Sequence, residues 1–205
     1  GGEGVLGPLG PGQVRADGRP GGPRNLPGQP EPQATTHFTG TVRLGLEPSR
    51  AEMVGANLDL SERTVSAEQI YGVYFHGPAY RVLERAWKTD SGVVGLMTHD
   101  LPPDRTPKDA PLVAAPRLIE LCFQTAGVLE MGTRGKMGLP LEVARVAIGR
   151  SPDLAGGSRL FAVVSPSGDD GGAYDARVVD EAGGVYVSLK GYHKLAVIVT
   201  VAGAV

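Results

Sequence analysis

One segment restricts the possible folds more than any other: residues 116–131 form a helix-prone run that is apolar on nearly every side. At about 100° per residue, the apolar positions fall on two opposite sides, with Leu118, Leu121, Cys122, Val128 and Leu129 on one and Ile119, Phe123 and Ala126 on the other. A helix of this kind must be covered by other elements. Pro116 suits its first turn, and Gly132 suits its end. The sequence therefore predicts one long, buried helix.

Most of the chain from residue 35 onward has the alternating or apolar sequence typical of strands. Strands are predicted at residues 36–44, 81–89, 92–99, 139–148, 158–165, 173–179 and 184–191, followed by a last buried strand or its overhang at 195–205. Ser66 is expected to open a short helix at residues 66–71. We therefore expect an α+β domain in which a curved, mostly antiparallel sheet wraps the long helix.

The start of the chain has a different composition, with ten Gly and seven Pro in the first 33 residues. Such a segment buries too little apolar surface to offset the entropy that it loses on ordering. We expect a flexible Gly/Pro-rich linker over residues 1–34 and a single domain over residues 35–205. The linker is typical of a piece cut from a longer polypeptide, although a disordered terminus has the same composition.

Charge and cysteine content exclude several classes of protein. A net charge of −2 is not the basic footprint of a nucleic-acid-binding protein. The single cysteine, Cys122, rules out an internal disulfide and a cysteine-rich zinc site, and its place in the apolar helix indicates a buried, inert thiol. No apolar run has the length of a membrane span, and we see no signal segment. We expect a soluble, cytoplasmic protein.

Two polar residues interrupt the apolar helix on one narrow stripe: Glu120 and, one turn later, Gln124, with Gly127 next along it. A carboxyl group entering an apolar interior has its pKa raised unless it is paired. That environment prepares the group for general acid–base work. Alternatively, Glu120 lies on a hydrated strip of the helix or pairs with a neighbouring arginine.

The second candidate site is an aromatic turn at residues 74–80, which reads Tyr-Phe-His-Gly-Pro-Ala-Tyr. Gly-Pro after aromatic residues marks a sharp turn that a ligand or another backbone approaches closely. Such a turn can present a backbone N–H to a thioester carbonyl oxygen. His76 is a general base, a hydrogen-bond donor or a packed side chain. The histidines show no metal-ligand spacing, and the motifs of serine hydrolases, phosphate-binding loops and dinucleotide sites are absent, so no metal site is expected.

At these two motifs the sequence resembles the dehydratase domains of modular polyketide and polyunsaturated fatty acid synthases, specifically the C-terminal half of their double hotdog. The family's Gly-Pro-x-Phe turn is matched by residues 76–80, its His-Pro-x-x-x-Asp-x-x-x-Gln/His helix by 115–124, and its Leu-Pro-Phe strand entry by 139–141. The resemblance covers about residues 35–195. It implies a hotdog fold, a curved antiparallel sheet around one long buried helix.

The sequence also departs from the family's pattern. Glu120 replaces the family's aspartate, His76 replaces the second aromatic of the turn, and Leu141 replaces the aromatic after Leu-Pro. The family's catalytic histidine lies in the N-terminal hotdog, in a His-x-x-x-Gly-x-x-x-x-Pro motif that no histidine of this chain matches. Residues 35–205 have the length of one hotdog and not of two. The resemblance therefore implies half of a catalytic unit.

The implied activity is loss of water from a β-hydroxyacyl thioester carried on the phosphopantetheine of an acyl carrier protein. A histidine takes the α-proton, Glu120 protonates the departing hydroxyl, Gln124 orients Glu120 or the hydroxyl, and His76 completes the catalytic set. The implied substrate-binding residues are Tyr74, Gly77, Pro78, Tyr80, Leu139 and Pro140. Neither a metal nor an organic cofactor is implied. The implied partners are the carrier protein and an N-terminal hotdog half or other synthase domains, not nucleic acid or a membrane.

Two alternatives come from other classes. The chain is a non-catalytic structural or docking half of a synthase, as the missing histidine and the changed aspartate suggest. Alternatively, it is a homodimeric hotdog thioesterase or hydratase, in which Glu120 of one subunit works with His76 of the other.

Overall fold

The computed structural model describes residues 4–10, 13–18, 38–43, 53–55, 58–59, 63–110, 114–168 and 172–200. The chain divides into two compact units, Gly1–Glu47 and Pro48–Val205. In the first, β1 (Gly4–Gly10), β2 (Gln13–Gly18) and β3 (Phe38–Arg43) form an antiparallel sheet in the order β1-β2-β3.

The hairpin of β1 and β2 lies where the sequence predicts a linker, and the boundary between the units falls after Glu47, not after residue 34. The Gly and Pro content hides a short alternation of polar and apolar residues from Gln13 to Asp17, the pattern of a strand. Residues 19–33 of the predicted linker lie outside the described residues.

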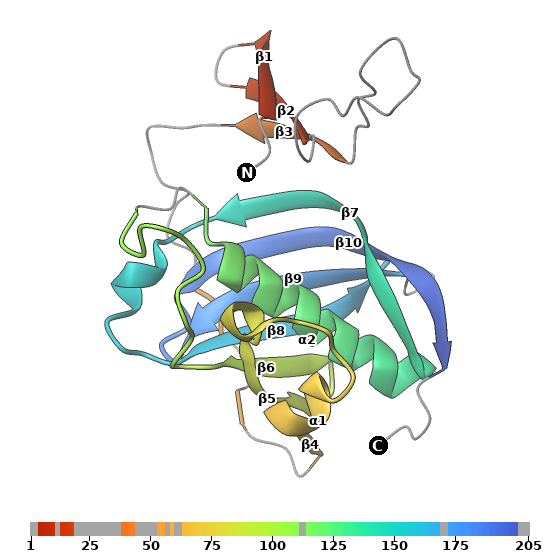
Figure 1. Ribbon diagram of the computed structural model, residues 1–205. Helices are drawn as coiled ribbons and strands as arrows, with labels where there is room; N and C mark the ends of the chain where they lie inside the picture. The colour runs from red at the N-terminus through yellow and green to blue at the C-terminus, as the bar shows by residue number, and fades with distance from the viewer. Residues whose placement is uncertain are drawn as a thin grey trace, which may run out of the picture. The chain divides into compact units, whose positions relative to one another are not determined.

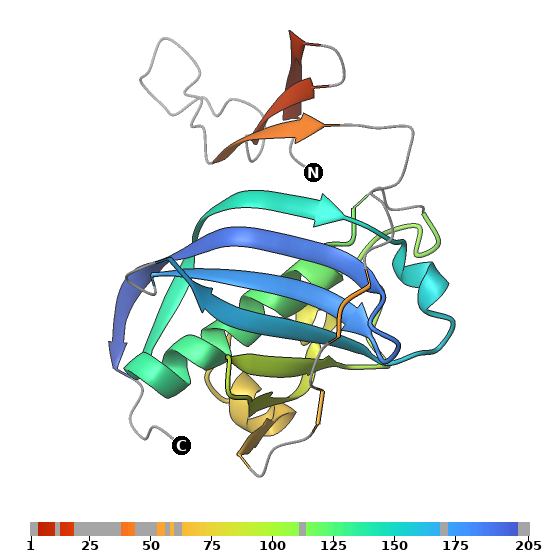
Figure 2. The same ribbon diagram turned by 180° about the vertical axis from the view of Figure 1, so that it is seen from behind.

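The second unit holds a seven-stranded antiparallel sheet in the order β4-β5-β6-β8-β9-β10-β7. Its strands are β4 (Thr64–Ser66), β5 (Leu83–Lys88), β6 (Val93–Met97), β7 (Lys136–Ile148), β8 (Leu160–Ser167), β9 (Ala173–Asp180) and β10 (Val185–Thr200). The sheet curves around the helix α2 (Pro116–Arg134), as Figures 1 and 2 show from opposite sides. The predicted α+β architecture is confirmed.

The helix α2 supplies the centre of the core. Leu118, Leu121, Cys122 and Ala126 are buried against side chains of the sheet, among them Leu83, Ala162 and Val178. Other side chains of the strands form a second, smaller apolar cluster, which includes Trp87, Val94, Leu96, Phe161, Val179 and Val185. The described helices include none long and apolar enough to cross a membrane.

The predicted end of α2 at Gly132 is wrong, because the helix continues to Arg134. Gly135 has the left-handed φ of 62° that stops the helix, and its N–H donates to the carbonyl of Met131. A glycine inside a helix is tolerated at a cost of about 1 kcal/mol relative to alanine, so Gly132 alone does not end it. What ends it is the left-handed residue, which glycine adopts without strain.

Two short helices position the aromatic turn beside α2. The helix α1 (Ala67–Tyr71) begins at Ser66, whose hydroxyl accepts from the Gln69 N–H while the Gln69 side chain accepts from the Ser66 N–H. The 3-10 helix η1 (Pro78–Tyr80) follows directly after the Gly77 cap. Arg117 of α2 donates to the carbonyls of Ala79 (3.1 Å) and Pro102, so it fastens the turn to the start of the long helix. The second 3-10 helix, η2 (Pro152–Ala155), lies between β7 and β8.

The last strand, β10, is longer than predicted and runs to Thr200. Leu195 in its second half is 55% exposed, so the predicted burial of this end does not hold at that residue. Residues 201–205 lie outside the described residues.

Candidate functional site

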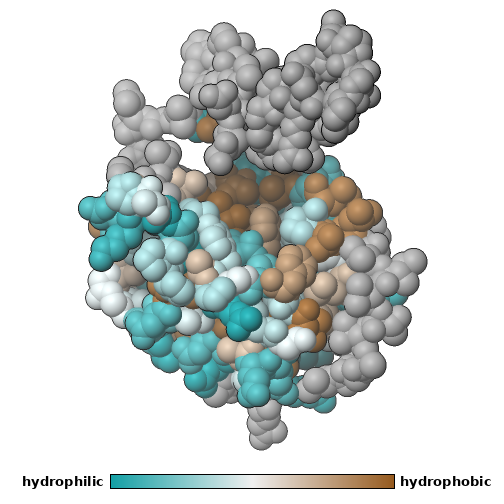
Figure 3. All heavy atoms as spheres, in the orientation of Figure 1, coloured by the Kyte–Doolittle hydropathy of each residue, from teal (hydrophilic) through white to brown (hydrophobic). Residues whose placement is uncertain are grey.

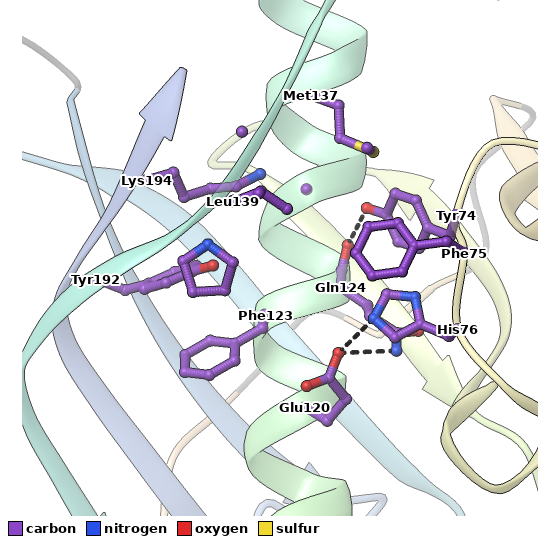
Figure 4. Close-up of a pocket in the computed structure, with 13 residues that line it drawn as sticks. Tyr74, Phe75, His76, Glu120, Phe123, Gln124, Met137, Leu139, Tyr192 and Lys194 are labelled. Carbon is purple, nitrogen blue, oxygen red and sulfur yellow. Dashed lines mark hydrogen bonds and ion pairs between the residues drawn. The ribbon is translucent and has the colours of Figure 1, made fainter. Parts of the chain in front are cut away.

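A small cavity of about 60 Å³ opens between α2, the aromatic turn, β7 and β10. Its walls are Tyr74, Phe75, His76, Glu120, Phe123, Gln124, Gly127, Met137, Gly138, Leu139, Pro140, Tyr192 and Lys194, drawn in Figure 4. Both sequence motifs therefore meet in one place, although His76 and Glu120 are 44 residues apart in the sequence. Of the predicted site residues, Glu120, Gln124, His76, Tyr74, Leu139 and Pro140 line the cavity.

Glu120 presents its carboxyl group at the cavity with one oxygen already held. Its Oε1 accepts a hydrogen bond from Nε2 of Gln124 at 2.9 Å and lies 2.9 Å from Nε2 of His76. Within the described part of the chain, Oε2 has no hydrogen-bond partner. The Glu120 and His76 side chains are each 23% exposed. Glu120 is therefore paired, as one of the sequence alternatives foresaw, but with a histidine in place of an arginine.

Gln124 is held in one orientation by three other groups. Its Nε2 donates to the carbonyl of Tyr80 at 2.8 Å as well as to Glu120, and its Oε1 accepts from the Tyr71 hydroxyl at 2.8 Å. A carbonyl only accepts and a hydroxyl in this position donates, so the amide cannot be turned over without losing both bonds. Gln124 thus aims a fixed N–H at Glu120.

The Tyr71 hydroxyl is itself held in place by a backbone hydrogen bond. Its hydroxyl accepts from the Leu83 N–H at 2.8 Å while it donates to Gln124. Burial, with the nearby Glu120 charge, raises the pKa of Tyr71 to about 12. The hydroxyl therefore stays protonated as a donor well above neutral pH.

His76 faces Glu120 with one ring nitrogen and a buried apolar wall with the other. The ring stacks on Phe75, with centroids 5.3 Å apart, and lies beside Tyr74 at 5.4 Å. Nδ1 is buried without a hydrogen-bond partner, whereas Nε2 has the Glu120 oxygen. Nε2 is therefore the ring nitrogen that meets the Glu120 carboxyl group.

Gly127 makes room for this arrangement. The Tyr74 hydroxyl donates to the Gln124 carbonyl at 2.8 Å, and a Cβ on Gly127 would lie only 2.2 Å from that hydroxyl. Burial raises the pKa of Tyr74 well above its usual value, so it too remains a neutral donor.

Three predicted substrate-binding residues, Gly77, Pro78 and Tyr80, do not line the cavity. Gly77 has an ordinary φ of −68° and caps η1, and no heavy atom lies within 4 Å of where its Cβ would be. Tyr80 contributes its backbone carbonyl, which orients Gln124. Their predicted contacts with a substrate remain predictions.

The sequence reasoning missed a buried ion pair at the cavity. Lys194 of β10 lies with its Nζ 2.6 Å from Oε2 of Glu130 on α2, and their side chains are only 3% and 7% exposed. The same oxygen accepts from the Gly138 N–H at 2.8 Å. Burial lowers the pKa of Lys194, although the Glu130 carboxylate opposes that effect. In the sequence, the pair could have been suspected from Lys194, a charged residue directly before the apolar run that begins at Leu195.

Cys122 is fully buried, and burial raises the pKa of its thiol, which confirms an inert cysteine. Among the described residues no cluster of three or more His, Cys, Asp or Glu could hold a metal ion. The contact between His76 and Glu120 forms within one chain, so it needs no second subunit.

A family model and several solved structures match the chain. A family model described as the polyketide synthase dehydratase N-terminal domain matches residues 51–197. No curated protein matches the chain. Among solved structures, the chain is similar to a trans-AT PKS dehydratase domain from Brevibacillus brevis, at 20% identity and a TM-score of 0.71, covering 95% of this chain and 68% of that one.

Two further dehydratase structures show the same likeness. The dehydratase domain from the CurF module of curacin polyketide synthase is 19% identical with a TM-score of 0.71, covering 95% of this chain and 67% of that one. The dehydratase domain of a mycocerosic acid synthase-like PKS is 19% identical with a TM-score of 0.65, covering 92% and 65%. These likenesses confirm the predicted hotdog fold.

Proposed function

Because the chain belongs to the polyketide synthase dehydratase family, we propose that it takes part in removing water from a β-hydroxyacyl thioester delivered by an acyl carrier protein. The observation that carries the proposal is the carboxyl group of Glu120, which lies at a cavity with Oε1 held by the Gln124 N–H and 2.9 Å from Nε2 of His76, while Oε2 is open. Glu120 is the acid that protonates the departing hydroxyl. Gln124 and His76 act by holding it.

The hydrogen bonds of the site favour the charge that the reaction creates. Before the reaction Glu120 carries a proton on Oε2, directed at the β-hydroxyl of the substrate. A base takes the α-proton, the C–O bond breaks, a carbon–carbon double bond forms, and the Oε2 proton leaves with the hydroxyl as water. The carboxylate left behind is stabilised on Oε1 by the N–H of Gln124 and by the nearby His76 ring. Fixed donors aimed at developing charge lower the barrier more than they stabilise the ground state.

The base is expected from a second hotdog, which makes this chain the acid-bearing, C-terminal half of a dehydratase. His76 is engaged with Glu120 through Nε2, and its Nδ1 is buried, so it is poorly placed to take a proton from carbon. The assignment to the C-terminal half rests on the helix motif from Pro116 to Gln124 and not on the description of the family model.

A direct test compares the wild type with Glu120→Gln and Glu120→Asp, each mixed with a His-bearing hotdog half and supplied with a β-hydroxyacyl pantetheine thioester. We expect Glu120→Gln to lose at least 100-fold in rate, since it has no proton to give. Glu120→Asp restores the family's residue and should retain part of the activity, with a carboxyl displaced by about 1 Å. Full activity of Glu120→Gln would show that Glu120 is not the acid.

The same assay separates the alternatives. Turnover by the chain alone would place the base within it, as a self-contained hydratase or thioesterase using His76 and Glu120 would require. No turnover with any His-bearing half, in a chain that still binds the thioester, would identify a docking half without catalysis.

A further inference from the structure

We propose that Lys194, which lines the cavity and pairs with the buried Glu130, forms a subsite for an uncharged oxygen, hydroxyl or carbonyl, on the acyl chain far from the thioester. The identity of the ligand as an acyl thioester rests on the function proposed above. The subsite itself rests on the placement of the lysine.

Lys194 and the catalytic group belong to one continuous cavity. The residues that line it include both Glu120 and Lys194 (Figure 4). A Cβ on Gly127 would lie 3.4 Å from the Lys194 Nζ, so the ammonium lies at the level of Gly127 on α2. Seven residues separate Glu120 from Gly127, which is about 10 Å along the helix axis. An acyl chain whose β-carbon is at Glu120 has this distance to cover before it meets the lysine.

The Lys194 ammonium has N–H bonds that no described residue accepts. A lysine carries three N–H bonds, and the described residues supply a single acceptor, Oε2 of Glu130. Among the described residues, the neighbouring Tyr74 hydroxyl bonds to the Gln124 carbonyl and not to Nζ. Because the lysine side chain is almost fully buried, its unused N–H bonds have little bulk water to satisfy them. An oxygen atom in the cavity would complete their coordination.

Removal of an ion pair from water is costly for each ion, and an apolar pair of the same size often packs equally well. This pair is therefore poorly explained as packing alone. Two glycines let the pair lie close to the neighbouring backbone: a Cβ on Gly138 would lie 3.0 Å from Oε2 of Glu130, and a Cβ on Gly127 would lie 3.4 Å from Nζ.

The charges decide which oxygen fits. Glu130 balances the lysine, so a carboxylate on the ligand would bring a second negative charge beside a buried one, which is unfavourable. A plain alkyl chain would leave the ammonium unsatisfied. An uncharged oxygen accepts a hydrogen bond from Nζ without adding charge.

The test measures binding, so it does not depend on turnover. The probes are 3-hydroxyacyl pantetheine amides of equal length, one fully alkyl and the others with a single keto group moved stepwise along the chain. For the wild-type chain, calorimetry should show one keto position that binds about tenfold tighter than the alkyl ligand, the size expected for a hydrogen bond to a charged donor. The double variant Lys194→Met with Glu130→Gln should lose this preference, and its glutamine still offers Gly138 an acceptor.

The matched control is Lys190→Met, which removes an exposed lysine of the same strand, β10, that pairs with Asp175 of β9. This variant should keep the preference. If the double variant does not fold, the carbonyl stretch of the ¹³C-labelled keto ligand on the wild type provides the test, since an ammonium donor shifts it to lower frequency. Equal affinity at every keto position, no binding of any ligand, a preference that survives in the double variant, or an unshifted stretch would overturn the subsite. Failure of the dehydration assay would leave these outcomes unchanged, because they require no chemistry.

Discussion

At the scale of single residues, the site depends on a relay of hydrogen bonds that ends at Glu120. The Leu83 N–H fixes Tyr71, Tyr71 fixes the amide of Gln124, and Gln124 aims its N–H at the carboxyl group. The Leu83 N–H can only donate to Tyr71, and the Tyr80 carbonyl can only accept from Gln124, so these two groups set the direction of the relay. Tyr71 therefore acts as a positioning residue, at one remove from the substrate.

Tyr71→Phe tests this relay. The Leu83 N–H loses its acceptor, which should cost about 1–3 kcal/mol of stability, and Gln124 loses its orientation, so the dehydration rate should fall. In the wild type the pKa of Tyr71 is raised from 10.0 to about 12, so its stabilising contribution is complete below pH 10 and lost as the pH rises to 12.

Denaturant unfolding between pH 8 and 12 should accordingly show a shallower alkaline decline in Tyr71→Phe than in the wild type. The control is Tyr80→Phe, because Tyr80 contributes only its backbone carbonyl to the relay. Loss of the Tyr80 hydroxyl should therefore leave the orientation of Gln124 unchanged. Identical alkaline slopes for the wild type and Tyr71→Phe would refute the assignment.

At the scale of elements, α2 determines where the site lies, and its C-terminal end shows which local signal stops a helix. Gly132 and Gly135 are three residues apart, and neither has any atom within 4 Å of its would-be Cβ. They differ only in the backbone: Gly132 lies inside the helix, and Gly135 has a φ of 62°. Substitutions at the two positions therefore isolate backbone conformation from packing.

Gly132→Ala should stabilise the chain by about 0.5–1 kcal/mol, because alanine has the higher helix propensity and loses less entropy on folding. Gly135→Ala should destabilise it by about 1 kcal/mol, since a Cβ is strained in the left-handed region. Thermal and denaturant unfolding of the pair measure both effects. Equal effects of the same sign would contradict the boundary of α2.

At the scale of the second unit, an apolar flank lies next to the cavity. β7 is at one end of the strand order, and its Leu139 and Leu141, with Leu195 of β10, are 39%, 59% and 55% exposed. Figure 3 shows apolar side chains gathered over this side of the unit. An exposed apolar sheet edge is typical of a surface that another domain covers, which supports the proposed second hotdog.

Leu141→Asp should weaken binding of a His-bearing hotdog at least tenfold without lowering the melting temperature of the chain alone, because an exposed side chain contributes little to folding. Leu154→Asp on η2, at a leucine that is 71% exposed, is the matched control and should bind normally. Binding is measured by calorimetry and melting by circular dichroism. Normal binding by Leu141→Asp would remove this flank from the interface.

Much of the fold follows from local sequence patterns. The apolar helix at residues 116–131, the capping Ser66 and most of the strands were predictable, since periodicity and capping depend on residues close in the chain. The strands in residues 4–18 were not, because their Gly and Pro content outweighs a short alternation. The helix end was misplaced because two glycines compete and only the folded backbone shows which one is left-handed.

For the site, the sequence by itself determined which residues could do chemistry: a carboxyl and an amide one turn apart on a buried helix, and a histidine in an aromatic turn. Only the tertiary structure decided their partners. His76 meets Glu120 across 44 residues of sequence, and Lys194 meets Glu130 across 64. The physical reason is that periodicity fixes the side of an element on which a residue lies, whereas a hydrogen bond requires two elements to be placed within about 3 Å of each other, and that placement comes from the packing of the whole core.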